Sequence, residues 1–160
     1  MDHLYHLSGA FLAVGSIIEP GNYGRIVRAM AWQHGHVFRE MALEEARLAR
    51  FPQAPSRLDS AFCFVTDADA RRFRSTIAGF GHHILYRVSL IDPNAASHVT
   101  DHRFCTGQGT IRHNWADIYW MDFNSQATAV PGVNWTAVIG GVHLREMLTL
   151  SQLRVEERLD

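Results

Sequence analysis

The chain has 160 residues, of which 47% are hydrophobic and 19% charged, and its formal net charge is −1 at pH 7. This composition excludes a disordered chain and predicts one folded domain over residues 1–160. The near-zero net charge gives no reason to expect a nucleic acid or an anionic membrane as a general partner. A nucleic-acid substrate is still compatible with it, because a local basic surface can exist on a protein without net charge. No apolar run is long enough to span a bilayer, so no membrane partner is expected.

The first six residues contain an acidic residue and lack the basic start and apolar stretch of a secretory signal peptide. The only two cysteines, Cys63 and Cys105, are too few for a disulfide framework. Reduced thiols and a cytoplasmic location are therefore expected. A secreted effector delivered without a classical signal peptide would have the same sequence features.

The first strand is predicted over residues 4–8, where apolar and polar positions alternate. Residues 17–18 form a brief extended piece that runs into a turn over residues 19–24. The turn contains Pro-Gly and Asn-Tyr-Gly, and its glycines accept a positive φ without steric strain. Arg25 follows this turn directly.

The next element, over residues 37–50, is predicted to be an amphipathic helix that ends before Pro52. Its hydrophobic positions are expected to face the core, and they are Val37, Phe38, Met41 and Leu48. The opposite face is expected to carry Glu44, Glu45 and Arg47.

A second strand is predicted over residues 60–65, and a helix follows over residues 67–78. Thr66 has an acidic residue, Asp69, three positions later, which resembles a capping box and makes Thr66 the expected N-cap. Residues 84–91 then give a third strand pattern, which Asp-Pro closes.

The second half of the chain contains fewer clear patterns. Residues 94–114 and 124–134 are expected to be loops, and residues 115–123 are either extended or a short helix. Three further strands are predicted, over residues 135–139, 144–150 and 153–158. Helices early and strands late predict a single mixed α+β domain.

One acidic residue interrupts an apolar strand pattern near the end of the chain. Residues two apart on a strand share a face. The members of this inward face are Leu144, Glu146, Leu148 and Leu150. Burial of an unpaired carboxylate is costly, so Glu146 is expected to be paired or to line a cleft, which makes it the first candidate for chemistry.

Three short motifs support a more specific interpretation: residues 4–8 (Leu-Tyr-His-Leu-Ser), residues 60–64 (Ser-Ala-Phe-Cys-Phe) before a helix, and residues 144–148 (Leu-Arg-Glu-Met-Leu). In this order they resemble the three motifs of the ADP-ribosyltransferase superfamily. The resemblance is to its His–Tyr–Glu branch, which includes the poly-ADP-ribose polymerases and diphtheria-like toxins. Residues 153–159 also look like small bacterial domains associated with this superfamily.

The resemblance implies a fold and a co-substrate. The fold would be two packed, mainly antiparallel sheets around a central NAD cleft, with flanking helices. Glu146 would be the catalytic residue, because a carboxylate near the ribose stabilises the oxocarbenium-like state formed as nicotinamide leaves. His6 would bind the adenosine-side ribose.

The remaining NAD-binding residues come from the same motifs. Tyr5 and Ser8 belong to the first motif, and Ser8 matches the hydroxyl residue that helps to seat the dinucleotide. Ser60 and Phe64 belong to the second motif, and Phe64 is the expected stacking partner of nicotinamide, with Tyr23 as a rival.

The chain departs from the family pattern at two positions. Leu7 stands where the family usually has Gly after the His, and Cys63 or Phe64 stands where it has Tyr. A Phe retains stacking but lacks the hydroxyl, so these departures concern the nicotinamide pocket more than the carboxylate.

Two arginines are candidates for the NAD pyrophosphate, because a guanidinium binds phosphate through two parallel hydrogen bonds. Arg25 follows the glycine-containing turn, and a solvated arginine is an equal alternative there. Arg57, which lies before the second strand, is a weaker candidate of the same kind.

A second group of residues has types that suit zinc: His98, His102 and Cys105, with His113 further along. A closed zinc site usually draws on two paired clusters, and the chain has no Cys-x-x-Cys. A histidine-rich loop with one buried cysteine is therefore expected, and no metal is assigned.

Together these observations predict an NAD-dependent ADP-ribosyltransferase that transfers ADP-ribose to an unidentified protein or nucleic-acid acceptor. Such an enzyme could be a toxin or effector with an antitoxin or immunity partner. The alternatives are an NAD glycohydrolase, a non-catalytic module that binds NAD or ADP-ribose, and a zinc-binding interaction domain. Leu144 lies two residues before Glu146, where arginine-modifying relatives often carry an acid or Gln, so arginine is not the expected acceptor.

Overall fold

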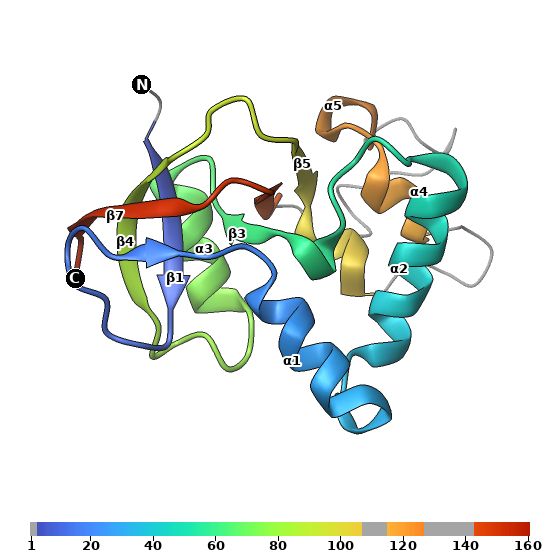
Figure 1. The fold of residues 1–160 in the computed structure, drawn as a ribbon, viewed down its shortest axis with the longest axis horizontal. Helices are drawn as coiled ribbons and strands as arrows, with labels where there is room; N and C mark the ends of the chain where they lie inside the picture. Colours follow the sequence, from blue (N-terminus) through green and yellow to red (C-terminus); the bar gives the residue numbers. More distant parts are fainter. Residues whose placement is uncertain (1–2, 107–114, 127–142) are drawn as a thin grey trace.

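Two antiparallel sheets form the framework of the computed structural model, which describes residues 3–106, 115–126 and 143–160 (Figure 1). The first sheet has the order β1-β4-β7-β2, and its strands are β1 (Leu4–Ser8), β4 (Ile84–Leu90), β7 (Leu153–Arg158) and β2 (Ile17–Ile18). The second has the order β3-β6-β5, with β3 (Ala61–Cys63), β6 (Arg145–Thr149) and β5 (Ser97–Asp101). The predicted mixed α+β class is confirmed.

The two sheets meet at their edge strands. The Tyr5 amide donates to the Phe64 carbonyl at 3.0 Å, and the Phe64 amide donates to the Tyr5 carbonyl at 2.7 Å. This single bridge links β1 to the end of β3. It places the N-terminal strand next to the sheet that carries β6.

Helices cover the sheets and connect their strands. In the described part of the chain, the α-helices are α1 (Asn22–Met30), α2 (Val37–Arg50), α3 (Asp67–Thr76), α4 (Trp115–Trp120) and α5 (Phe123–Gln126). Short 3₁₀ helices are η1 (Ala31–Gln33), η2 (Arg57–Asp59) and η3 (His102–Thr106). The predicted N-cap of α3 is confirmed, because the Thr66 hydroxyl accepts from the Asp69 amide at 3.1 Å.

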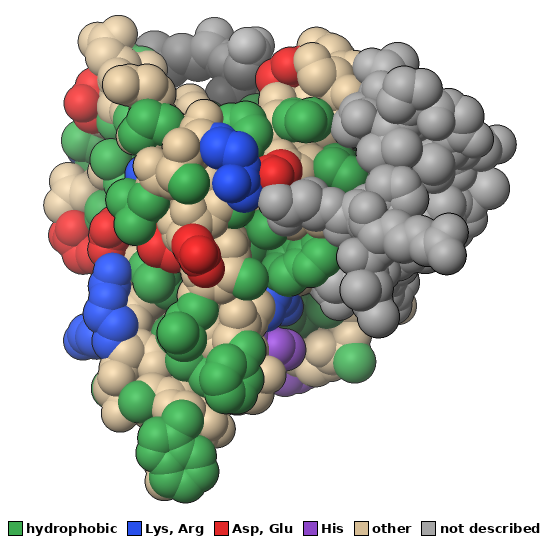
Figure 2. Space-filling model, turned by 90° about the vertical axis from the view of Figure 1, so that its right-hand side faces the viewer, with side chains coloured by type: hydrophobic (Ala, Val, Ile, Leu, Met, Phe, Trp, Pro, Cys, Tyr) green, Lys and Arg blue, Asp and Glu red, His purple; other side chains and the backbone are tan. Residues whose placement is uncertain are grey.

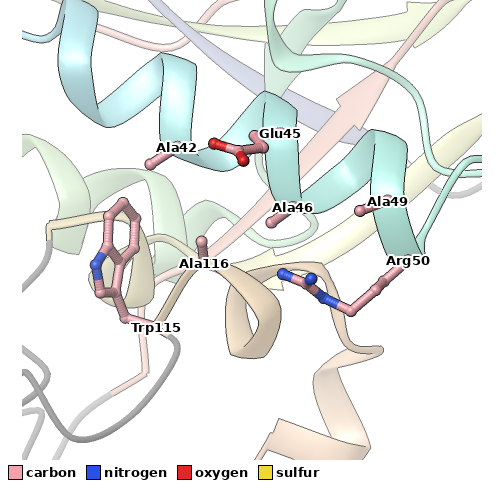
Figure 3. A pocket seen from close by; sticks show the side chains of 7 residues that line it. All are labelled: Ala42, Glu45, Ala46, Ala49, Arg50, Trp115 and Ala116. Carbon is pink, nitrogen blue, oxygen red and sulfur yellow. The ribbon is translucent and has the colours of Figure 1, made fainter.

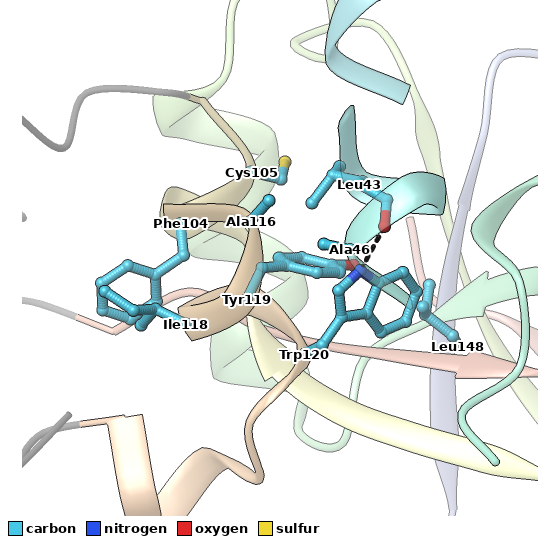
Figure 4. Close-up of a cluster of buried hydrophobic side chains, with 9 residues drawn as sticks. All are labelled: Leu43, Ala46, Phe104, Cys105, Ala116, Ile118, Tyr119, Trp120 and Leu148. Atoms are coloured by element: carbon cyan, nitrogen blue, oxygen red, sulfur yellow. Dashed lines mark hydrogen bonds between the residues drawn. The ribbon is translucent and has the colours of Figure 1, made fainter. Parts of the chain in front are cut away.

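Among the residues that the structure describes, three buried clusters form the core. One lies between the two sheets and includes Leu4, Cys63 and Val155, with the partly buried Met147 packed against it. A second lies between the first sheet and α3. The third lies between the second sheet, α2, η3 and α4 (Figure 4), where the Trp120 indole donates to the Leu43 carbonyl at 2.7 Å.

The structure corrects three of the sequence predictions about the elements. The turn that contains Asn22 continues as α1, so Arg25 belongs to a helix. The predicted loop over residues 94–114 contains β5 and η3. For the segment 115–123 an extended piece and a short helix were both left open, and the structure shows the helix α4. Residues 124–126 belong to α5, whereas the rest of the predicted loop to residue 134 and the predicted strand 135–139 lie outside the described residues.

Helix α2 has the predicted bounds but faces the core with a different side. Its buried residues are Glu40, Leu43 and Ala46, whereas Phe38, Met41 and Leu48 are more than half exposed. The predicted inward face was therefore wrong. The reason is that Glu40 has two cationic partners, the buried Arg57 and the partly buried Arg39, which lower the penalty of placing a carboxylate in the core.

Gly24 fixes the approach of α1 to η2. A Cβ atom at this position would lie 1.8 Å from the Leu58 carbonyl oxygen. The atoms that a Cβ at residue 24 would meet are backbone atoms of Leu58, which cannot rotate away as a side chain can. We therefore expect Gly24→Ala to lower the free energy of unfolding by about 1–3 kcal/mol, as for other overpacked sites. Urea unfolding followed by circular dichroism measures this change.

Gly35→Ala is the matched control, because nothing lies within 4 Å of a Cβ atom added there. Equal stability of the two variants would show that the close approach of α1 to η2 is not required.

Within the described segments, no helix has both the length and the apolar character needed to cross a membrane.

Candidate functional site

Glu146 is the second residue of β6, the central strand of the second sheet, and it is 3% exposed. Its Oε1 atom accepts hydrogen bonds from Arg57 Nη1 and from the Tyr119 hydroxyl, both at 2.7 Å. Its Oε2 atom lies 3.1 Å from His102 Nδ1. This carboxylate was expected to be paired or to line a cleft, and the structure shows it paired. Leu150, which was expected on the same face, lies beyond the strand and is exposed.

Arg57 is the cation at the centre of the site and is 3% exposed. Short helix η2 places it there, and the Ser56 side chain caps this helix by accepting from the Leu58 amide. The guanidinium lies 5.0 Å from the ring centroids of both Phe62 and Tyr119, so aromatic faces support it from β3 and α4.

A second carboxylate binds the same guanidinium from the other side. Arg57 Nε donates to Glu40 Oε2 at 3.0 Å. The other oxygen of Glu40 accepts from Arg39 Nη2 at 2.8 Å and from the Tyr23 hydroxyl at 3.0 Å. Two buried carboxylates, from α2 and β6, therefore share one arginine from η2.

The charges of this cluster shift the pKa values of its members. Burial alone would raise the pKa of Glu146, but the positive charges of Arg57 and His102 lower it well below its usual range. Burial also opposes ionisation of Glu40, and Arg57 with Arg39 lowers that pKa. Both carboxylates are therefore ionised at neutral pH.

His102 completes the cluster from η3. Burial would lower the pKa of this imidazole, but Cys105 and Glu146 raise it to about 10. The Cys105 thiol lies 3.4 Å from His102 Nδ1 and 3.8 Å from Nε2. The imidazole is thus in contact with both a carboxylate and a thiol.

His6 belongs to a different cluster from Glu146. Its Nδ1 atom lies 2.8 Å from the Phe62 carbonyl oxygen, and burial lowers its pKa. By strand alternation His6 shares the face of Leu4, which packs in the core between the sheets, whereas Glu146 points away from that core because its neighbour Met147 packs there. The structure therefore does not bring these two side chains together.

The other predicted residues of the first and second motifs serve local structure. Tyr5 and Phe64 form the backbone bridge between the sheets, and the Phe64 ring is buried against α3 with Phe73. The Ser8 hydroxyl accepts from the Ala10 amide at 3.1 Å. Ser60 donates to the Ser56 carbonyl at 2.7 Å, which shapes η2 and so positions the arginine of the site.

Two residues predicted to bind NAD, Tyr23 and Arg25, come from the turn over residues 19–24 or follow it directly, and only Tyr23 contacts the cluster around Arg57. Tyr23 binds Glu40 through its hydroxyl, and its ring packs edge-on against Phe62 at 5.5 Å between centroids. Arg25 is exposed and donates to Asn22 Oδ1 at 2.6 Å. Arg57, predicted as a weak phosphate ligand, is instead enclosed by carboxylates.

The predicted zinc-type group is only partly assembled. His98 Nε2 lies 3.4 Å from the Tyr119 carbonyl oxygen and its ring packs on Trp120. His98 does not belong to the group of metal-ligating side chains that converge in the described part of the chain. His113 lies outside the described residues. His102 and Cys105 do come together, but with Glu146 as the third member.

Sequence reasoning missed Glu40, Tyr119 and the pairing of His102 with Glu146. One signal was present for Glu40: it lies three residues before Leu43 and six before Ala46, on one helical face, and that face is the buried one. Tyr119 has no comparable signal, because its partners are distant in sequence.

A separate groove of about 360 Å³ lies between α2 and α4 (Figure 3). Its lining residues are Ala42, Glu45, Ala46, Ala49, Arg50, Trp115 and Ala116. None of the predicted site residues lines it. The Arg50 and Asp117 side chains form an ion pair beside it.

No protein-family model matches the chain and neither does any curated protein, so the case for a function rests on the geometry of the site and on the motifs of the sequence.

Proposed function

We propose that the chain is an NAD-dependent ADP-ribosyltransferase in which Glu146 is the catalytic carboxylate. The observation that carries this proposal is the buried, ionised Glu146 held by Arg57, Tyr119 and His102 on the central strand of the second sheet. Cleavage of the nicotinamide–ribose bond generates positive charge on the ribose. A fixed negative charge in a site of low dielectric constant stabilises that charge strongly.

The hydrogen bonds to Glu146 also define how it could meet a ribose. Arg57 and Tyr119 hold Oε1, and they set the orientation of the carboxylate. Oε2 faces His102 and has the longer contact, at 3.1 Å. We therefore place the ribose 2′-hydroxyl at Oε2, where it would exchange with the imidazole.

We propose an ADP-ribosyltransferase-like arrangement for the fold. The three resembling motifs lie on β1, on β3 with α3, and on β6, and the bridge between β1 and β3 brings them to adjoining strands. The neighbouring positions of these motifs support the proposal, while the side chains of His6 and Glu146 point to opposite faces of the strands.

In this proposal His6 acts at the adenosine end of NAD, away from the bond that breaks. Its Nδ1 atom is occupied by the Phe62 carbonyl, so Nε2 is the atom that would meet a ribose hydroxyl.

We expect His6→Ala to raise the Kd for NAD about tenfold while kcat changes less than threefold, since one hydrogen bond to bound substrate is worth about 1.4 kcal/mol. Calorimetric titration with NAD and steady-state kinetics measure the two effects separately. A fall in kcat with an unchanged Kd would contradict the assignment. Ser89→Ala on the neighbouring strand β4 is the control, because Ser89 has no proposed NAD contact and its exposed hydroxyl donates to Glu156 Oε1.

The test of the function itself is release of nicotinamide from NAD by the purified chain. Release that depends on an added protein or nucleic acid, with ADP-ribose recovered on it, supports the transferase. Equal release with water as the acceptor identifies the glycohydrolase. Binding of NAD without release identifies a non-catalytic module, and no binding removes the proposal.

The role of a toxin or effector is part of this proposal. A chain that consumes NAD or modifies a macromolecule would slow growth when expressed, and Glu146→Gln would relieve that effect. An antitoxin or immunity partner would be expected to cover the site.

A further inference from the structure

Three buried side chains of metal-ligating type converge beside β6. One ligand atom from each of His102, Cys105 and Glu146 lies within 4.8 Å of the other two. His102 Nδ1 is 3.1 Å from Glu146 Oε2 and 3.4 Å from Cys105 Sγ. We propose that these three residues form a binding site for a zinc ion, and that zinc bound there withdraws Glu146 from the reaction.

The types of ligand favour zinc over harder or larger cations. Thiolate, imidazole and carboxylate are the three protein ligands of Zn²⁺, and a site with three of them leaves a fourth position for water. Calcium and magnesium prefer oxygen ligands alone, so Cys105 selects against them. The His-x-x-Cys spacing on one turn of η3 is also the short spacing that zinc ligands use.

The distances fit a small tetrahedral ion. Ligand atoms that surround Zn²⁺ at its usual bond lengths lie roughly 3.2–3.8 Å from one another. The separation of His102 Nδ1 from Cys105 Sγ, 3.4 Å, lies within this range, and that from Glu146 Oε2, 3.1 Å, lies just below it. The third pair, Cys105 Sγ and the Glu146 carboxylate, lies within 4.8 Å. The thiol is nearly equidistant from both imidazole nitrogens, so it lies off the lone-pair axis of Nδ1, and a rotation of the Cys105 side chain must accompany binding.

The neighbours of the site supply the second layer that metal ligands need. Arg57 and Tyr119 donate to Oε1, which leaves Oε2 as the ligand atom and fixes its direction. Zinc binding forms the Zn–S bond and displaces the thiol proton of Cys105 to solvent. The proton-bearing imidazole likewise gives up a proton from Nδ1 before that atom can bind the ion.

The inhibitory consequence rests on the proposed function, because it assumes that Glu146 works on NAD. A carboxylate oxygen bound to Zn²⁺ is not available to a ribose hydroxyl, and the charge of the ion opposes the cationic transition state. Zinc would therefore act as a negative regulator that a chelator removes.

The metal site is tested with Co²⁺, because the absorption spectrum of the bound ion depends on the type and number of its ligands. We expect the metal-free full chain to bind one equivalent of Co²⁺ and to show a thiolate-to-cobalt charge-transfer band together with the visible bands of a tetrahedral ion. Addition of Zn²⁺ should abolish both. Cys105→Ser and His102→Ala should each weaken binding at least tenfold, as loss of a ligand does, with loss of the thiolate band in Cys105→Ser.

Cys63→Ala is the matched control, since Cys63 is the other buried thiol and packs in the core between the sheets. This variant should keep the band. Absence of the band from the wild-type chain, or its persistence in Cys105→Ser, would overturn the metal site. Circular dichroism of each variant shows whether it folds, and if Cys105→Ser does not, alkylation of Cys105 in the Cys63→Ala chain, blocked by Zn²⁺, gives the same answer.

Activity is measured separately. If the metal site and the proposed function both hold, Zn²⁺ inhibits nicotinamide release and a chelator restores it. Metal binding in a chain that never releases nicotinamide would uphold the site and remove the proposed function. Unchanged release by the zinc-loaded chain would overturn the inhibitory role.

Discussion

Replacement of Glu146 by Gln is expected to reduce nicotinamide release by about 10²–10³-fold, because it removes the charge that stabilises the cationic transition state. Gln has nearly the same shape as Glu, so Oε1 can still accept from Arg57 and Tyr119. The fold should persist, because Arg57 keeps its second carboxylate partner, Glu40. Chromatographic measurement of nicotinamide, with the variant and wild type at equal concentrations of folded protein, gives the ratio.

Glu40→Gln is the matched control for this experiment. It removes the same charge from the same arginine, but from the side that faces α2, where its partners are Arg39 and Tyr23. We expect the two variants to lose similar stability and the Glu40 variant to retain most of its turnover. Normal turnover by Glu146→Gln, or equal losses in both variants, would remove Glu146 as the catalytic residue.

Replacement of Arg57 by Met is expected to lower the free energy of unfolding by about 3–5 kcal/mol, which is the usual effect of removing one partner from a buried ion pair. Two carboxylates would lose their shared cation, and Glu40 and Glu146 are each at most 3% exposed. The total stability of a domain is about 5–15 kcal/mol, so this change consumes a large fraction of it. Urea unfolding measures the difference.

A double-mutant cycle separates the charge effect from lost packing, since the guanidinium also contacts Phe62 and Tyr119. In a Glu40→Gln, Glu146→Gln background, Arg57→Met leaves no carboxylate unpaired and should destabilise much less. The exposed Arg25→Met serves as a surface control and should change stability by less than about 0.5 kcal/mol. An equal effect of Arg57→Met in both backgrounds would show that packing, rather than charge, accounts for the loss.

Several elements could be predicted from sequence because their causes are local. The alternation over β1, the bounds of α2 and the Thr66 cap all follow from neighbouring residues. Helix α1 was missed because the Gly21–Asn22 turn pattern continues directly into it, and Gly21 adopts the left-handed conformation at its N-cap. Strand β5 was missed because its polar sequence, Ser-His-Val-Thr-Asp, gains its order from pairing with β6.

The burial of one side of α2 shows the limit of periodicity. Hydrophobic positions predicted a core face through Phe38 and Met41, yet these side chains are exposed. Exposed hydrophobic side chains are also visible on the face of the molecule that Figure 2 shows. Glu40 lies inside because η2 brings Arg57 to it. A helix cannot encode that choice alone, since the free energy of burying its carboxylate depends on a cation 17 residues away.

In the candidate site, too, one property follows from the local sequence and another only from the tertiary structure. Alternation along residues 144–148 determined that Glu146 faces inward, because strand geometry alone sets which side chains share a face. Only the tertiary structure decided its partners, since Arg57, Tyr119 and His102 reach it from η2, α4 and η3 across separations of 89, 27 and 44 residues. Contacts at such distances arise from the packing of whole elements, and no local pattern of residue types records them.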